Sequence, residues 1–219
     1  MVESPLLHLV LKSLLKRYIV NHGLHALLPK RKEPFTREML LDMINLDPPI
    51  GKSSAYGPCD NIHDFIVVLT LLKILSQTGM RLSEPIGTED ECRPSLCWDA
   101  FIYLSENVLF HSLSGEQAAK MNADSCVLFK NGTAMADPTG SHWAPFLVYL
   151  PFRWGEPINA AKAIMDLDQI VQVPEADRKA TPVFVKHNGR KIARTYLVNT
   201  IEAMVKALPK QFLFHSARI

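Results

Sequence analysis

The sequence predicts an α+β fold that is mainly helical, with one small antiparallel β-sheet. Apolar residues recur at helical spacing in several capped segments, whereas the middle of the chain holds short apolar runs between turn signals. Hydrophobic residues make up 47% of the 219 residues and charged residues 21%, which is enough apolar material for a core. The chain can therefore form one domain of ordinary size, together with a fragment of another.

The N-terminal segment predicts one amphipathic helix followed by a linker. Between Leu6 and Ile19 the apolar residues form a single stripe, at positions 6, 7, 10, 11, 14, 15, 18 and 19. One helix of this length cannot bury such a stripe alone, so it must pack against another part of the chain or against a partner. Residues 28–34 carry prolines around a basic run, which is typical of a linker.

Two further helices are predicted from their caps. Thr36 is a capping residue for a helix over residues 37–44. Asp60 or Asn61 can cap a longer helix that runs to about residue 77, and Gly79 closes it. Apolar residues at 62, 65, 66, 68, 69, 72 and 75 predict that this longer helix is deeply buried on one side.

The central part of the chain predicts the sheet. Ser95–Tyr103, Asp124–Phe129 and Trp143–Pro151 are runs of strand length and composition. Turn signals lie at Asn131-Gly132 and at Asp137-Pro138-Thr139-Gly140. Short strands joined by turns favour an antiparallel arrangement.

The C-terminal part returns to helices. Glu156–Ile170 predicts a helix that begins near Pro157, and residues 182–185 predict a short buried segment. Arg194–Leu208 predicts an amphipathic helix that Pro209 ends. Its apolar face consists of Leu197, Ile201, Met204, Val205 and Leu208.

Charge is unevenly distributed, although the net charge is only +2. Residues 84–124 hold eight acidic and two basic residues, whereas residues 178–219 hold nine basic residues and one acidic residue. A basic C-terminal third can neutralise several phosphates of a nucleic acid. The alternative is that these charges are solvated and scattered over several faces.

Several classes of protein are disfavoured. The four cysteines form no C-x-x-C pair, which argues against a zinc site or a disulfide framework. No signal peptide is recognisable, and the longest apolar run, residues 65–72, is too short to cross a bilayer. We therefore expect an intracellular protein, nuclear or otherwise, that is not secreted, does not span a membrane and needs no metal or small-molecule cofactor.

Two motifs carry the functional prediction. Thr78-Gly79-Met80-Arg81-Leu82-Ser83-Glu84 and His215-Ser216-Ala217-Arg218 supply two arginines and a histidine, which together suit one phosphate. Their order, T-G-x-R-x-S-E and then H-x-x-R, resembles the tyrosine recombinases, or phage-type integrases. Pro182–Val185, Gly189-Arg190 and Arg194–Leu197 resemble that family's approach to H-S-x-R. Residues 136–143 resemble the sheet turn of recombinases from eukaryotic mobile elements, and residues 32–36 their entry into the catalytic domain.

The resemblance covers roughly residues 30–219 and implies a catalytic-domain fold that is incomplete at its C-terminus. It implies that residues 1–29 contain the remnant last helix of a preceding core-binding domain, that 30–36 form the linker, and that 37–219 form the catalytic-like domain. Arg81 and Arg218 would clamp the phosphate, and His215 would donate a hydrogen bond or assist proton transfer. Duplex DNA is the implied partner, with further contacts from Lys130, His142 and Arg194.

The sequence departs from the family pattern in three ways. No tyrosine follows H-x-x-R, whereas the family's nucleophile lies there, and the later His or Trp of the usual site is also absent. The five tyrosines present better fit a core or a sheet. Met135 stands where the family has the lysine that protonates the leaving hydroxyl, and Lys130 is displaced from that position by five residues. We therefore expect DNA binding without autonomous strand cleavage.

Other interpretations remain open at this stage. The chain can be a helical interaction or regulatory protein in which both motifs are coincidental or vestigial. It can also work in trans, with a partner that donates a tyrosine helix. Because a truncated core leaves apolar surface uncovered, self-association is a further expectation.

Overall fold

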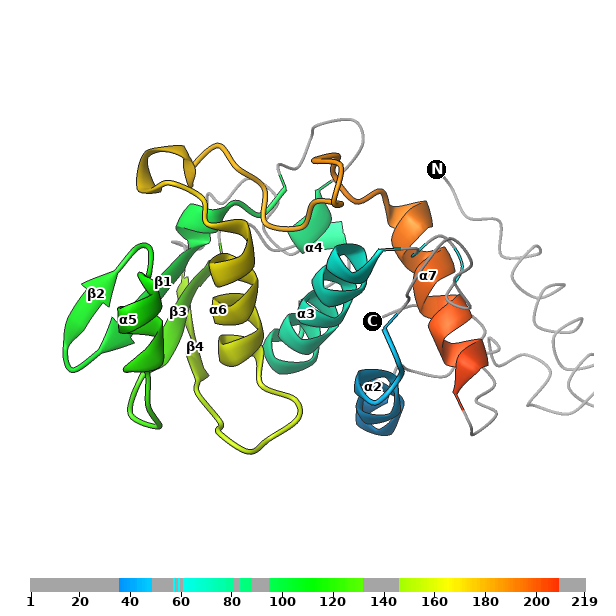
Figure 1. Cartoon of the computed structure of the whole chain (residues 1–219), viewed down its shortest axis with the longest axis horizontal. Helices are drawn as coiled ribbons and strands as arrows, with labels where there is room; N and C mark the ends of the chain where they lie inside the picture. The colour runs from blue at the N-terminus through cyan, green and yellow to red at the C-terminus, as the bar shows by residue number, and fades with distance from the viewer. Residues whose placement is uncertain are drawn as a thin grey trace, which may run out of the picture. The chain divides into compact units, whose positions relative to one another are not determined.

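The computed structural model describes residues 36–48, 57, 59, 61–80, 83–87, 95–131 and 146–208. The chain divides into two units, Met1–Glu33 and Pro34–Ile219, and every described residue lies in the second. The described part is a mixed α+β structure with six α-helices and a four-stranded antiparallel sheet (Figure 1). The helices are α2 (Arg37–Ile44), α3 (Ile62–Thr78), α4 (Ser83–Ile86), α5 (Gly115–Ala119), α6 (Ala160–Val171) and α7 (Arg194–Ala207).

The predicted caps of α2 and α3 are confirmed. The Thr36 hydroxyl accepts a hydrogen bond from the Met39 amide at 3.2 Å, and the Asn61 side chain accepts one from the His63 amide at 2.8 Å. Gly79 ends α3 with φ of 69°, and its amide donates to the Leu75 carbonyl at 2.9 Å. This left-handed conformation costs glycine little, which is why a glycine closes the helix.

Helix α3 is the central helix of the core. It packs against both α2 and α6, and only part of its surface reaches solvent. Nine of its 17 residues are buried: Asp64, Phe65, Val67, Val68, Thr70, Leu71, Leu72, Ile74 and Leu75. Burial on several sides explains why its apolar residues do not follow a single narrow stripe.

The last two helices match the predictions closely. Helix α6 begins at Ala160 instead of Glu156, because Asn159 caps it by accepting a hydrogen bond from the Lys162 amide at 2.9 Å. Helix α7 begins at Arg194, as predicted, and packs against α2. All five residues of the apolar face predicted for α7 are buried.

The sheet has the strand order β2-β1-β3-β4, and all neighbours are antiparallel. Its strands are β1 (Phe101–Ser105), β2 (Val108–Phe110), β3 (Cys126–Asn131) and β4 (Phe146–Pro151). The prediction of a strand from Ser95 was wrong at its start, because residues 98–100 form a 3-10 turn and Cys97 makes only an isolated bridge to Pro182.

Two elements were missed from the sequence. Strand β2 follows a tight turn in which Glu106 and Asn107 have φ of 50° and 65°, and it then pairs with β1. Helix α5 begins with a capping box, in which the Ser114 hydroxyl accepts from the Gln117 amide and the Gln117 side chain accepts from the Ser114 amide. Both elements are too short for a repeating pattern of apolar residues to be recognised in the sequence.

The two faces of the sheet differ in burial. On the inner face, Phe101, Tyr103, Val127 and Phe129 are fully buried, and the rings of Phe101 and Phe129 stack at 5.2 Å. Tyr103 reaches α6 from this face, so the core lies between the sheet and the helices. The outer face is more open, with Leu109, Leu147 and Tyr149 each more than half exposed.

Several predicted elements lie outside the described residues. They are the helix over 6–19, the linker and the turn at 137–140. None of the helices in the described ranges is long and apolar enough to cross a membrane.

Candidate nucleic-acid interface

Four of the six predicted site residues, Arg81, His142, His215 and Arg218, lie outside the described residues, as does Met135. Lys130 and Arg194 are described, and both are exposed. The chain on either side of Arg81 is nevertheless well anchored. Met80 is only 6% exposed at the end of α3, and Ile86 in α4 is only 7% exposed.

Leu96 joins two of the motif segments through its backbone. Its amide donates to the Pro85 carbonyl at 2.9 Å, and its carbonyl accepts from the Val183 amide at 2.9 Å. Ser95 adds a hydrogen bond from its hydroxyl to the Ile86 carbonyl at 3.0 Å. The segment that follows Arg81 therefore lies beside the Pro182–Val185 segment, although about a hundred residues separate them in the sequence.

Residues Lys186–Lys191 form an exposed turn that we name the basic hairpin. The Lys186 amide donates to the Arg190 carbonyl and the Gly189 amide to the Lys186 carbonyl, both at 2.8 Å. Gly189 adopts φ of 76°, a conformation that favours glycine, and Val185 and Lys191 form a bridge at the base. The hairpin is thus a defined turn whose side chains project from a paired backbone.

Asp64 anchors the basic hairpin to the core. This carboxylate, in the first turn of α3, is only 1% exposed. It accepts hydrogen bonds from the His187 amide at 2.6 Å and from the Tyr196 hydroxyl at 2.9 Å, and the His187 Nδ1 lies 3.2 Å from it. One buried acidic group therefore fixes the hairpin and the first turn of α7 to α3.

Four cations lie between residues 186 and 194, and three of them are exposed while Lys186 is half-buried. Lys186, Arg190 and Lys191 belong to the basic hairpin, and Arg194 follows in the first turn of α7. The Lys186 ammonium lies 3.6 Å from the centre of the Tyr196 ring, a cation–π contact that holds its stem. Residues 178–201 contain no aspartate or glutamate, and the carboxylate that contacts the hairpin is the buried Asp64.

Lys130 lies apart from the basic hairpin in the topology. It is an exposed residue of β3 and pairs across the sheet with Leu147 of β4 on the outer face. Within the described ranges, no hydrogen bond or ion pair links Lys130 to the hairpin. Of the two described DNA-binding candidates, the structure therefore groups Arg194 with the hairpin and leaves Lys130 on the sheet.

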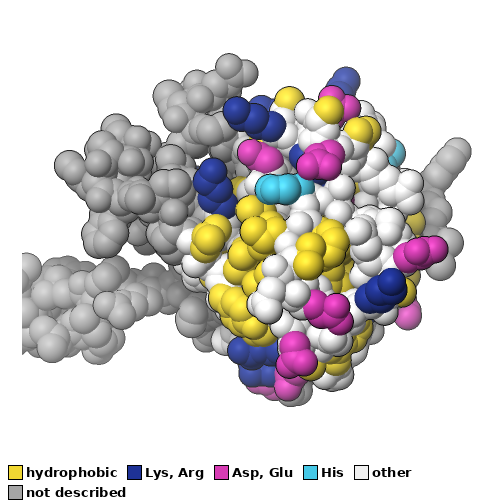
Figure 2. All heavy atoms as spheres, turned by 90° about the vertical axis from the view of Figure 1, so that its left-hand side faces the viewer, with side chains coloured by type: hydrophobic (Ala, Val, Ile, Leu, Met, Phe, Trp, Pro, Cys, Tyr) yellow, Lys and Arg dark blue, Asp and Glu magenta, His cyan; other side chains and the backbone are white. Residues whose placement is uncertain are grey.

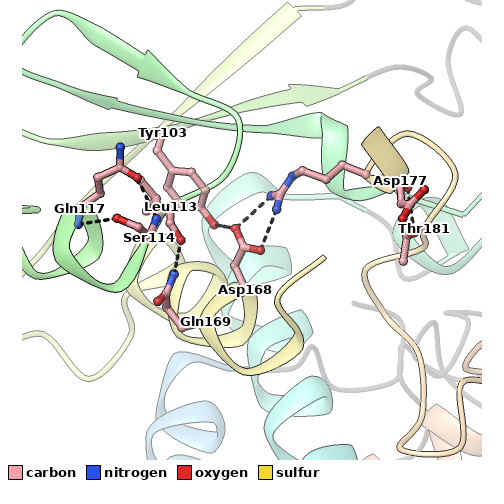
Figure 3. Close-up of polar contacts among 9 residues, drawn as sticks. Tyr103, Leu113, Ser114, Gln117, Asp168, Gln169, Asp177 and Thr181 are labelled. Atoms are coloured by element: carbon pink, nitrogen blue, oxygen red, sulfur yellow. Dashed lines mark hydrogen bonds and ion pairs between the residues drawn. The ribbon is translucent and has the colours of Figure 1, made fainter. Parts of the chain in front are cut away.

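The basic C-terminal third includes one arginine that cannot serve as a surface cation. Arg178 is only 2% exposed, and its guanidinium binds both oxygens of Asp168 at 2.8 and 3.0 Å. Tyr103 donates its hydroxyl to the same carboxylate at 2.8 Å (Figure 3). The Arg178 guanidinium also lies 5.2 Å from the centre of the Trp98 ring. Counting Arg178 among the charges available to phosphate was therefore wrong.

Two of the described tyrosines are engaged as hydrogen-bond donors. Burial raises the pKa of Tyr103, and the charge of Asp168 raises it further. Burial also raises the pKa of Tyr196, with its hydrogen bond to Asp64 as the next cause. A nucleophilic hydroxyl needs the opposite shift, so both side chains have structural roles. Tyr103 is a buried sheet residue, as predicted, whereas Tyr196 is half-buried in α7.

The described residues also line open pockets. One, of about 510 Å³, lies beside the Asp168–Arg178 pair and is lined largely by residues 112–117 and 168–178. The other, of about 440 Å³, lies between β4 and the ends of α2 and α3, where Arg37 pairs with Glu156 at 3.3 Å. At each pocket two charged side chains pair with each other, Arg178 with Asp168 and Arg37 with Glu156. No group of three or more His, Cys, Asp or Glu in the described part of the chain could hold a metal ion.

Comparisons with known proteins do not assign a family. No protein-family model, curated protein or solved structure matches this chain. A functional assignment must therefore come from the chain's own residues, and the basic hairpin is the described feature that best fits a nucleic acid.

Proposed function

We propose that this chain binds duplex DNA through the basic hairpin and Arg194, as a domain related to the catalytic domains of tyrosine recombinases. The observation that carries the proposal is the hairpin itself. It presents the exposed cations Arg190 and Lys191 and the half-buried Lys186, with Arg194 beside them, and Asp64 holds its backbone from within the core.

The chemistry of this surface suits a phosphate backbone. Each cation that neutralises a phosphate releases condensed counterions, which favours binding and makes the affinity depend on salt. Arg190 and Arg194 can pair with phosphate oxygens in fork geometry, whereas Lys186 and Lys191 act as point charges. A turn fixed to a buried carboxylate loses little conformational entropy when it binds, so a larger share of the contact energy appears as affinity.

Two observations support the recombinase part of the proposal. The T-G-M-R motif begins at the glycine-capped end of a buried helix, so that Arg81 would start from a rigid element. The Leu96 backbone brings the segment after Arg81 beside residues 182–185, which the resemblance also uses. On this proposal Arg81 and Arg218 clamp one phosphate, and His215 assists them.

Fluorescence anisotropy of a labelled duplex, measured against salt concentration, tests the proposal. Four phosphate contacts at the hairpin and Arg194, with the one phosphate that Arg81 and Arg218 clamp, predict a slope of log affinity against log salt of about −4.5. Arg81→Ala and Arg218→Ala should each weaken binding and reduce the magnitude of the slope by about 1. Circular dichroism of each variant serves as the control for folding.

Two outcomes would contradict the proposal in different ways. Absence of duplex binding at low salt would reject DNA as the partner and favour a helical interaction protein. Binding that survives both arginine substitutions with an unchanged slope would keep DNA as the partner but reject the phosphate clamp.

A further inference from the structure

His187 of the basic hairpin contacts a buried carboxylate with one side of its ring, while the rest of the ring reaches solvent. Its amide donates to Asp64 at 2.6 Å, its Nδ1 lies 3.2 Å from the same carboxylate oxygen, and 44% of its side chain is exposed. Within the described ranges, no hydrogen bond involves its Nε2. One ring nitrogen is therefore engaged by Asp64, and the other is free to contact a ligand.

Asp64 determines which nitrogen of the neutral ring carries the proton. A carboxylate only accepts hydrogen bonds, so the Nδ1 beside it must be the donor. The other oxygen of Asp64 accepts from the Tyr196 hydroxyl at 2.9 Å, so donors occupy both oxygens. In the neutral ring Nε2 is consequently an acceptor, and it becomes a donor only when the imidazole is protonated.

The phosphates of a nucleic acid also only accept hydrogen bonds, so the neutral ring offers them nothing. We propose that His187 is a further DNA contact of the basic hairpin, which binds a backbone phosphate through Nε2 in its protonated form alone. This inference rests on the function proposed above. It adds that a proton and duplex DNA bind to the hairpin together, each favouring the other.

The surroundings of His187 suit such a contact. The titratable and charged groups in the elements that hold it are Cys59, His63 and Asp64 at the start of α3, Lys186, Arg190 and Lys191 of the hairpin, and Arg194 and Tyr196 in the first turn of α7. Asp64 is the acidic member of this set, and it is only 1% exposed. A phosphate that arrives at the exposed side adds a negative charge beside the ring, which favours the cationic imidazole.

Fluorescence anisotropy of a labelled duplex, measured at constant salt between about pH 5.5 and about pH 8, tests this inference. His187→Asn keeps an amide donor near the position of Nδ1 and removes the nitrogen that gains the proton. At the alkaline end it should bind as the unsubstituted chain does. At the acidic end it should bind roughly fivefold more weakly, as expected for the loss of one exposed ion pair. A purely structural role would weaken binding equally at both ends.

His111→Asn is the matched control. His111 is also exposed, and it follows β2 at the edge of the sheet. Figure 2 views the molecule from the side on which Figure 1 draws β2, and side chains of both charges are interspersed on that face, which does not favour a phosphate. This variant should therefore keep the full pH dependence. His142 and His215 are unchanged in both variants, so the comparison isolates one histidine.

The outcomes separate this inference from the proposed function. Absence of duplex binding at every pH would reject both. Binding by His187→Asn with the pH dependence of the unsubstituted chain would overturn the inference alone, as would equal changes in His111→Asn or equal losses at both ends of the pH range. If circular dichroism shows that His187→Asn does not fold, His187→Gln replaces it. Its amide donates at every pH, so the same share of the pH dependence should be lost.

Discussion

Two buried aspartates organise this chain, and they differ in what they hold. Asp168 of α6 receives the Tyr103 hydroxyl and the Arg178 guanidinium, and all three side chains are at least 96% buried. Asp64 of α3 receives the Tyr196 hydroxyl and the His187 amide, and the His187 side chain is 44% exposed. The first cluster is sealed within the core, whereas the second opens onto the basic hairpin.

The difference separates a stabilising cluster from one that presents a surface. Asp168 and Arg178 form an ion pair that is shielded from solvent, and removal of either side chain would leave the other as an unpaired buried charge. Asp64 instead satisfies neutral donors, and its effect is to fix a turn that carries exposed cations. We therefore expect Asp168 to govern mainly stability, and Asp64 to govern both stability and DNA affinity.

The largest effect is expected from Asp168→Asn. This substitution leaves the Arg178 guanidinium buried without its counter-charge, which should cost about 3–5 kcal/mol in the free energy of unfolding. Urea unfolding followed by circular dichroism measures this cost. Asp166→Asn on the same helix is the matched control, because Asp166 and Lys162 form an exposed pair whose loss should cost no more than about 1 kcal/mol. Equal costs for the two variants would contradict a sealed ionic cluster.

A smaller loss of stability is expected from Asp64→Asn, together with a loss of DNA affinity. The substitution disturbs buried hydrogen bonds to neutral donors, so the free energy of unfolding should fall by about 1–3 kcal/mol. A less ordered hairpin should also weaken duplex binding by roughly 2- to 12-fold, the equivalent of about 0.5–1.5 kcal/mol. The same unfolding and anisotropy measurements give both values. A stability loss with unchanged affinity would show that the anchor does not serve the DNA surface.

The smallest effects concern the two tyrosine donors and appear only at alkaline pH. Because the pKa of Tyr103 and of Tyr196 is raised in the folded chain, the unfolded chain ionises first as pH rises above the ordinary value of 10.0. The unfolded state then binds fewer protons, so stability is retained below pH 10 and declines above it. Tyr103→Phe and Tyr196→Phe should each make this decline shallower. If the free energy of unfolding falls with pH as steeply in the Phe variants as in the unsubstituted chain, or more steeply, the assigned donor roles are contradicted.

The parts of the fold that the sequence predicted are those that local chemistry determines. Thr36, Asn61 and Gly79 cap helices through contacts within four residues, and the boundaries of α2 and α3 followed from such signals. The start of α7 followed from its amphipathic pattern. Strand β2 was missed because its turn uses Glu106-Asn107 instead of the usual glycine-containing pair. The serine and glutamine of the α5 capping box are a local signal from which this helix can be predicted.

The candidate site was predicted less completely, because its anchors are distant in sequence. Arg194 and the resemblance through Gly189-Arg190 pointed to the region that carries the basic hairpin. Asp64 gave no sign of its role, since its partners lie 123 and 132 residues away. Arg178 looked like any other cation of a basic segment, and only tertiary packing reveals that Asp168 neutralises it.

The central claim is that the basic hairpin binds duplex DNA, and a charge-matched pair of variants tests it most directly. Arg190→Ala combined with Lys191→Ala removes two exposed cations from the hairpin. Lys120→Ala combined with Arg153→Ala removes two exposed cations from α5's end and from the loop after β4. The account predicts that the hairpin variant reduces the magnitude of the salt slope by about 2, while the control variant retains the slope of the unsubstituted chain. Equal reductions in both variants would contradict it, because net charge alone would then explain the binding.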